Sequence, residues 1–384
     1  MRGYLHYLAR HNVAIRLLDL SPGGGRKGFV RRFADLTATS LDRTGPGAWI
    51  HVGGGGEFSR GTAHHRDLAQ AAGRAAAYHL WWELPVLRPE VVAELERFDA
   101  VIASTRFIED VARRHLRSPA VLYAPQPLAV ADGPRPLPDR GRFGIPPAAV
   151  AVLSSFDPCS DLERKNPRAA LEAFARAATH APQLRLVIKL MLPPAGVDGL
   201  APRLAWLRAA TVADPRIIVI DDALDDVDLY ALFASCDAYL SLHRAEGLGL
   251  GMLEAMHLGL PVVATAYSGN MSFMDARSAC LVPFRTVPVQ GTSVPTYAAV
   301  AALKPTWADP DVDAAAAHLV RLANDPDWRA DRGRAAASAA ASYQREALGF
   351  EWLAALAAIA RERRAIVLSS RRVYPGVSAT FKLG

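Results

Sequence analysis

The sequence predicts an α/β protein of two domains, each built on a doubly wound parallel sheet. The chain has 384 residues, and at roughly 100–200 residues per domain this length allows two or three domains. From residue 148 onward, short apolar runs of strand length alternate with stretches of helical periodicity, an order typical of parallel sheets joined by right-handed crossovers. Residues 125–147 contain seven prolines and are therefore predicted to form a linker between the two halves.

The composition is that of a soluble globular protein, with 51% hydrophobic and 21% charged residues. The three cysteines, Cys159, Cys236 and Cys280, lie far apart and form no CxxC pair, so neither a disulfide framework nor a zinc site is predicted. No apolar run reaches transmembrane length, and the N-terminal residues lack a signal-peptide pattern. A cytoplasmic protein is expected.

The net charge is uneven, since residues 1–140 contribute +5 of the total of +6. A basic first half could face an acidic acceptor or the anionic inner face of a membrane, as a peripheral contact. An arginine-rich composition without a function explains it more simply. Aromatic residues do not alternate with the basic ones, so nucleic acid is not an expected partner.

In the first half, residues 4–11 have helical spacing and are predicted to form a helix. Strands are predicted over 13–20, 48–52, part of 75–84, 98–103 and 120–124. In the second half, strands are predicted over 149–155, 184–190, 216–220, 238–242 and 261–264, with helices over 166–179, 200–211, 225–235, 252–258, 312–324, 328–341 and 346–363. Residues 284–310 are predicted to be a long loop packed over a ligand site.

A glycine loop lies between the strand at 238–242 and the helix at 252–258. Gly247, Gly249 and Gly251 occupy alternate positions, which lets backbone approach a ligand closely. A strand, a glycine loop and a helix N-terminus together form an anion site, because unpaired N–H groups and the helix dipole point at the ligand.

Glu246 and Glu254 frame this loop with seven residues between them. Carboxylates accept hydrogen bonds from sugar hydroxyls, so the loop and its two acids together indicate a nucleotide sugar. Taken alone, Glu254 at the start of the helix would only offset the helix dipole, and Glu246 would be a solvated loop charge.

The segment Glu246-x7-Glu254, followed by Ala-Met-x-Leu-Gly-x-Pro-Val-Val-Ala264, resembles the donor-site signature of the retaining GT-B glycosyltransferases of family 4, also called glycosyl transferases group 1. The resemblance implies two Rossmann-like domains. It places an acceptor-side domain at 1–133, a linker at 134–147, a donor domain at 148–345, and a C-terminal helix that crosses back, with a tail, at 346–384. It also implies that the first strand of domain one and its glycine-rich loop are missing upstream of Met1.

Two further loops, each following a strand, contain residues that are predicted to bind the donor. Adjacent cations, Arg164 and Lys165, precede Pro167 at a predicted helix start, where they would oppose the dipole unless they met an anion. The resemblance implies that Lys165 binds the diphosphate and that Arg164 stands near the place of its usual partner. Ser268, Gly269 and Asn270 follow the strand at 261–264 and offer polar groups for sugar recognition, although a turn needs no ligand.

His79 lies in Tyr78-His79-Leu-Trp-Trp82-Glu83-Leu-Pro85, which resembles a stretch at the interdomain cleft of one branch of the family. The resemblance implies that His79 contacts the donor sugar as a catalytic residue beside Glu246, with His51 as the reserve. An aromatic core strand with a buried histidine explains the same residues equally well.

Together with these observations, the resemblance implies a hexosyltransferase that moves a sugar from a nucleotide-diphosphate donor to a saccharide, lipid-linked or small-molecule acceptor with retention of configuration, as in polysaccharide biosynthesis. Neither a cofactor nor a metal is expected, because no Asp-x-Asp stands beside the phosphates. A non-catalytic nucleotide-sugar-binding partner subunit is the alternative. A Rossmann dehydrogenase is disfavoured, since the third glycine of its fingerprint is replaced by Glu254.

Overall fold

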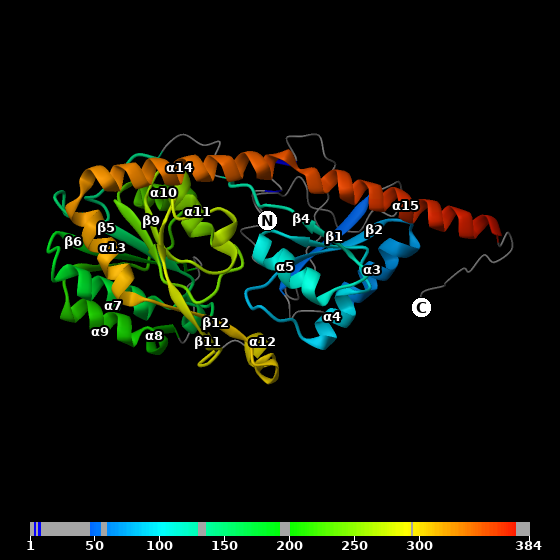
Figure 1. Cartoon of the computed structure of the whole chain (residues 1–384), viewed down its shortest axis with the longest axis horizontal. Helices are drawn as coiled ribbons and strands as arrows, with labels where there is room; N and C mark the ends of the chain where they lie inside the picture. Colours follow the sequence, from blue (N-terminus) through cyan, green and yellow to red (C-terminus); the bar gives the residue numbers. More distant parts are fainter. Residues whose placement is uncertain are drawn as a thin grey trace.

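The computed structural model describes Tyr4, Tyr7, Leu8 and residues 47–54, 60–129, 136–192, 200–292 and 295–373. The helix predicted at 4–11 is described only at Tyr4, Tyr7 and Leu8, which are helical. The strand predicted at 13–20 lies outside the described residues. Figure 1 shows two α/β bodies side by side, with two long helices running across both.

The first body holds a four-stranded parallel sheet in the order β1-β2-β3-β4. The strands are β1 (Ala48–Gly54), β2 (Ala75–Trp81), β3 (Ala100–Ala103) and β4 (Ala120–Tyr123). The helices between them are α3 (Arg60–Ala71), α4 (Pro89–Leu95) and α5 (Arg106–His115). Thr105 caps α5 by accepting a hydrogen bond from Ile108 N, and Pro89 opens α4, where a missing N–H costs nothing.

The second body holds a six-stranded parallel sheet in the order β10-β9-β8-β5-β6-β7. Its strands are β5 (Val150–Phe156), β6 (Leu184–Leu190), β7 (Ile217–Ile220), β8 (Ala238–Ser241), β9 (Val262–Thr265) and β10 (Cys280–Val282). Counted from β5, this is the strand order 3-2-1-4-5-6 of a dinucleotide-binding sheet. The crossovers contain α6 (Leu162–Lys165), α7 (Pro167–Ala178), α8 (Leu200–Arg203), α9 (Ala205–Ala213), α10 (Asp226–Ala234) and α11 (Leu250–His257).

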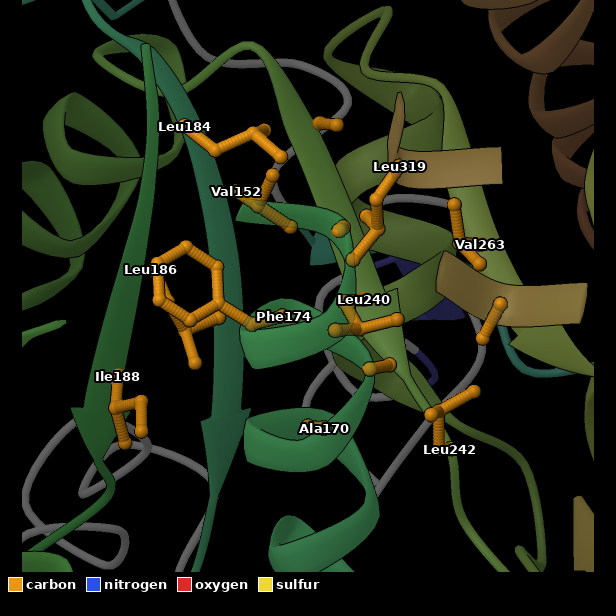
Figure 2. Close-up of a cluster of buried hydrophobic side chains, with 14 of the residues drawn as sticks. Val152, Ala170, Phe174, Leu184, Leu186, Ile188, Leu240, Leu242, Val263 and Leu319 are labelled. Atoms are coloured by element: carbon orange, nitrogen blue, oxygen red, sulfur yellow. The ribbon is translucent and has the colours of Figure 1, made fainter. Parts of the chain in front are cut away.

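Burial on both faces explains why these strands are continuous apolar runs. On one face, Ala170 and Phe174 of α7 pack against Leu186 and Leu240 of the sheet, as Figure 2 shows. On the other face, a second cluster gathers around α11 and α14 (Pro326–Gly349). The two clusters fix the sheet, and with it the loops at the carboxyl ends of its strands.

The described residues of 284–310, which omit 293 and 294, form a small structured unit, so the prediction of a loop was wrong. β11 (Phe284–Pro288) and β12 (Thr306–Pro310) pair antiparallel, with α12 (Pro295–Ala298) and a short 3-10 helix, η4 (Ala301–Leu303), between them. We call residues 284–310 the arm. Five consecutive residue pairs between β11 and β12 hold its base together, which a Pro- and Thr-rich sequence without clear alternation does not reveal.

The C-terminal part is helical, as predicted: α13 (Val312–Asn324), α14 and α15 (Glu351–Val373). Phe350 has a left-handed backbone (φ 48°) and separates α14 from α15. Trp352, Leu356 and Ala360 of α15 pack into one cluster with Ala75 and Ala100 of the first sheet. The chain therefore returns to the first body at its C-terminal end (Figure 1).

Most predicted elements agree with the structure to within a few residues, and the prediction of two Rossmann-like parallel-sheet domains is confirmed. The predicted domain boundaries stay predictions. The helix predicted over 200–211 is two helices, α8 and α9, and the short helix α6 was not predicted.

Candidate active site

The candidate site lies where the strand order of the second sheet reverses. From the adjacent strands β5 and β8, the chain crosses in opposite directions, to β6 and to β9. At such a switch point the loops leaving the carboxyl ends of the two strands move apart and leave a crevice for a ligand. The loop after β5 contains Arg164 and Lys165, and the loop after β8 contains Glu246 and the glycines. A hydrogen bond of 2.8 Å between Ser155 Oγ and Tyr239 Oη ties the two strands together just beneath.

Glu246 is the centre of the charge cluster. Its carboxylate accepts a hydrogen bond from Lys165 Nζ and lies 3.3 Å from Arg164 Nη1. Burial by itself would raise the pKa of Glu246, but the charges of Lys165 and Arg164 outweigh it and lower the pKa to about 2. Glu246 is therefore ionised at any physiological pH. It can accept hydrogen bonds but cannot supply a proton.

The two cations directly precede the start of α7, as predicted, but they also end a short helix, α6, that was not predicted. Arg164 and Lys165 form the last turn of α6, where positive charge agrees with the helix dipole. Asn166, with φ 50°, ends α6 and precedes Pro167, which opens α7 as predicted. The charges of Arg164 and Lys165 therefore agree with the dipole of α6 and oppose that of α7, so the case for an anion at these residues now depends on their position at the switch point.

Arg164 and Lys165 differ in accessibility. Arg164 is buried, donates to Ala245 O at 2.8 Å and to Ser160 Oγ at 2.9 Å, and so forms the floor beneath Glu246. The side chain of Lys165 is 21% exposed and donates a hydrogen bond to the Glu246 carboxylate. Of the two, Lys165 is the cation that a diphosphate can reach.

Each glycine of the loop has a separate structural reason. Gly249 precedes α11 with φ +88°, a backbone conformation that other residues adopt only with strain. A Cβ on Gly251 would lie 2.5 Å from Tyr239 Oη, so this glycine allows α11 to pack closely on β8. A Cβ on Gly247 would lie 3.3 Å from Trp82 O of the first body. Among the described residues no side chain caps α11, so its first N–H groups face the loop.

The loop after β9 supports the site from the side. Ser268 has a strained backbone (φ 72°, ψ −139°), and its Oγ accepts a hydrogen bond from Glu246 N at 2.8 Å. Gly269 N donates to Glu246 O at 2.9 Å. Asn270 is fully buried, and its amide bonds Thr265 O and His243 Nε2. Ser268 and Asn270 therefore shape the loop that carries Glu246, whereas their roles as sugar ligands stay predictions.

Glu254 lies one turn further into the helix than predicted. Because α11 begins at Leu250, Glu254 is its fifth residue, and the helix has no acid in its first turn. Offsetting the helix dipole therefore does not explain this residue. Glu254 Oε1 accepts a hydrogen bond from Tyr230 Oη at 3.0 Å, and the side chain is partly exposed on the helix that follows the glycine loop.

His79 and His51 lie within the first sheet. His79 is 2% exposed, with its ring 5.4 Å from that of Tyr4 and 5.1 Å from that of Trp81, and burial lowers its pKa to about 3. Burial also lowers the pKa of His51 to about 4, and its ring lies 5.7 Å from that of Phe98. Both are neutral at physiological pH. These ring contacts are all with residues of the first body, so contact of either histidine with a donor sugar stays a prediction.

Two residues of the first body reach the site although the sequence did not predict them to lie there. Thr105, interpreted as an N-cap, also donates to Gly247 O at 2.9 Å. Glu83 has a carboxylate oxygen 4.0 Å from Arg164 Nη2. Both follow the carboxyl end of a strand, β3 or β2, and this position is the signal that could have found them.

Among the described residues, no group of three or more His, Cys, Asp or Glu side chains could hold a metal ion. In the same part of the chain, no helix is long and apolar enough to cross a membrane.

Comparisons with known proteins agree with this architecture. A family model described as "Glycosyl transferases group 1" matches residues 153–290, which include both loops of the switch point. No curated protein matches the chain. Among solved structures, HepE of Anabaena with UDP bound is similar at a TM-score of 0.58 and 16% identity, over 94% of this chain and 88% of that one.

Two larger proteins share the fold over part of their length. The pneumococcal O-GlcNAc transferase GtfA, in complex with UDP and GlcNAc, has a TM-score of 0.51 and 16% identity, over 76% of this chain and 54% of that one. A TarM variant of S. aureus, in complex with UDP, Fondaparinux and α-GlcNAc-glycerol, has a TM-score of 0.53 and 12% identity, over 74% of this chain and 51% of that one. The chain thus spans about half the length of these two proteins. Residues 153–290 thus match glycosyl transferases group 1, and the two-sheet architecture of the chain is the GT-B fold that it shares with HepE.

Proposed function

We propose that this chain is a glycosyltransferase that uses a nucleotide-diphosphate sugar as donor and retains the anomeric configuration, as its resemblance to family 4 implies. The observation that carries the proposal is the ionised Glu246, held by Lys165 and Arg164 beside the glycine loop at the switch point. The complexes of HepE and GtfA with UDP support a uridine nucleotide as the first donor to test.

In this proposal the diphosphate leaving group meets Lys165 and the N–H groups at the start of α11. Charge develops on the leaving oxygen as its bond to the anomeric carbon breaks, and fixed donors stabilise that charge at little reorganisation cost. Since Lys165 pairs with Glu246 in this structure, a diphosphate that binds its ammonium group replaces one anion with another. No metal ion is needed if these groups supply the positive charge.

Glu246 is proposed to bind the transferred sugar. Because its pKa is about 2, it stays a carboxylate and accepts hydrogen bonds from hydroxyls of the transferred sugar. Arg164 and the main-chain contacts of Ser268 and Gly269 keep the carboxylate in place while Lys165 turns to the phosphate. Glu254 is the proposed ligand of the ribose hydroxyls, whereas the acceptor stays open between a saccharide, a lipid-linked saccharide and a small molecule.

The test is product formation from UDP-, GDP- and ADP-sugars with a panel of acceptors, in the presence and absence of a chelator. Wild type is expected to release nucleoside diphosphate and to form an anomerically retained product, seen by NMR, with no loss on chelation. Glu246→Gln is expected to lower turnover at least about tenfold, since a charged hydrogen bond contributes roughly 1.5–3 kcal/mol. A product of inverted configuration would contradict the proposed mechanism.

A non-catalytic nucleotide-sugar-binding subunit is the second outcome of this experiment. It would bind the donor and release no nucleoside diphosphate with any acceptor. Its donor affinity would be lowered by Glu254→Ala but not by Glu246→Gln.

A further inference from the structure

The arm contacts both domains next to the candidate site. At its base, Ala308 N donates to Arg244 O at 2.9 Å, two residues before Glu246. At its far end, Tyr297 is 6% exposed and lies in one apolar cluster with Trp82 and other side chains of the first domain. The arm is thus fixed to the donor loop on one side and to the first domain on the other.

Glu83 lies where the arm, the first domain and the site meet. It belongs to the loop after β2, and its Oε2 accepts a hydrogen bond from Tyr297 Oη at 2.7 Å. The Tyr297 ring meets the Trp82 ring edge-on, with centroids 5.8 Å apart. The other carboxylate oxygen, Oε1, faces Arg164 Nη2 at 4.0 Å. Tyr297 therefore orients Glu83 toward Arg164.

Arg164 consequently faces carboxylates from both domains. Nη1 lies 3.3 Å from Glu246 Oε2, and Nη2 lies 4.0 Å from Glu83 Oε1. The Arg164 side chain is only 5% exposed, so solvent and salt screen these charges weakly. Among the described residues, Glu246 is the one carboxylate still paired with Arg164 once Glu83 loses its charge.

We propose that Glu83 is a positioning residue that sets the Glu246 carboxylate for transfer by sharing Arg164 with it, and that Tyr297 of the arm holds Glu83 in place. This inference rests on the proposed function. Glu83 acts through Arg164 and is not assigned a contact with the donor. Its effect requires that the loop after β2 be seated on the second domain, so it couples the acceptor-side domain to the sugar-binding carboxylate.

Glu83→Gln and Tyr297→Phe test the inference, since each keeps the shape of its side chain. Both are expected to lower kcat about tenfold and to change the donor KM less than about twofold, because positioning contributes mainly in the transition state. The double variant is expected to be no worse than either single one, as for residues that act as a unit. A merely structural role would lower the midpoint of thermal unfolding and leave kcat of the folded enzyme unchanged.

Tyr343→Phe is the matched control. Its hydroxyl accepts a hydrogen bond from Gln126 N at 3.1 Å, between α14 and the segment after β4, away from the charge cluster. Like Tyr297→Phe, it removes one buried hydroxyl from a contact between distant segments. It is expected to keep wild-type kcat, and an equal loss of kcat in this control would overturn the inference.

A double-mutant cycle between Glu83→Gln and Arg164→Met, measured by thermal unfolding, requires no activity. We expect the effect of Glu83→Gln on stability to be smaller in the Arg164→Met background. An additive cycle, or wild-type kcat in both Glu83→Gln and Tyr297→Phe, overturns the inference while the proposed function stands. A coupled cycle in a protein that turns over no donor overturns the proposed function, and the positioning role with it.

Discussion

At the scale of single residues, the site depends on one carboxylate shared between two cations of unequal burial. Arg164 is buried next to Glu246 and donates hydrogen bonds to Ala245 O and Ser160 Oγ, whereas Lys165 is partly exposed. The two cations are therefore suited to different roles. Arg164 keeps Glu246 in place, and Lys165 can exchange its partner for a phosphate.

Glu246 should also make the stability of the protein depend on pH. Its pKa falls from 4.5 to about 2 on folding, so its contribution is complete above pH 4.5 and disappears as the pH falls toward 2. The loss should reach at most about 3 kcal/mol of unfolding free energy. Denaturant unfolding of wild type and Glu246→Gln between pH 7 and pH 3 measures it, and the difference between the two proteins should shrink below pH 4.5. A difference that does not depend on pH would contradict the assigned ion pairs.

The residue types of the site were largely predictable, whereas their connections were not. Glu246, Lys165 and the glycines follow from the spacing between a strand and a helix. The pairing of Arg164 with Glu83 depends on a contact between residues 81 positions apart in different domains, which no local pattern encodes. For the same reason the buried bonds of Asn270 to His243 and Thr265 could not be foreseen.

At the scale of elements, the close contact between the loops after β8 and β9 is the most demanding feature. A Cβ on Gly269 would lie 2.2 Å from Gly247 O, and backbone on both sides leaves little room to move. Gly269→Ala should therefore weaken donor binding at least about tenfold and lower the unfolding free energy by roughly 1–3 kcal/mol. Calorimetric titration and thermal unfolding measure the two effects.

Gly333→Ala provides the control for that prediction. A Cβ at Gly333 would lie 2.3 Å from Gly259 O, where α14 crosses the end of α11 that is remote from the glycine loop. We expect similar destabilisation with unchanged donor affinity. If both variants lost affinity equally, the effect of Gly269→Ala would be one of general stability and not of the site.

Regular elements were predicted well because their signals are local. The apolar runs of β5, β6 and β8 and the cap and proline signals of α7 and α13 follow from the chain itself. α6 is only four residues long, and the arm depends on antiparallel pairing between residues 18 to 26 positions apart, so neither has a sufficient local signal. The missed α6 also leaves the dipole argument for Arg164 and Lys165 incomplete, because these residues end α6 as well as precede α7.

At the scale of the whole molecule, the strand order creates the site, and three contacts bring the first domain to it. The reversal between β5 and β8 separates the two loops, while Thr105, Glu83 and the arm contact them from the other side. Alternation of strands and helices predicts such a sheet, and a reversal point can be expected somewhere in it. Which first-domain residues meet that point depends on how the two bodies pack, and this follows only from the structure.

The central claim is that the switch point of the second sheet binds a nucleotide-diphosphate sugar. Calorimetric titration of UDP, GDP, ADP and their sugars into wild type, Glu254→Ala and Glu172→Ala tests it most directly, since Glu172 is an exposed helix carboxylate paired with Arg176 elsewhere. We expect base-selective binding that Glu172→Ala keeps and that Glu254→Ala weakens by roughly 1.5–3 kcal/mol. Absence of binding to any nucleotide, or equal affinities in all three proteins, would contradict the claim.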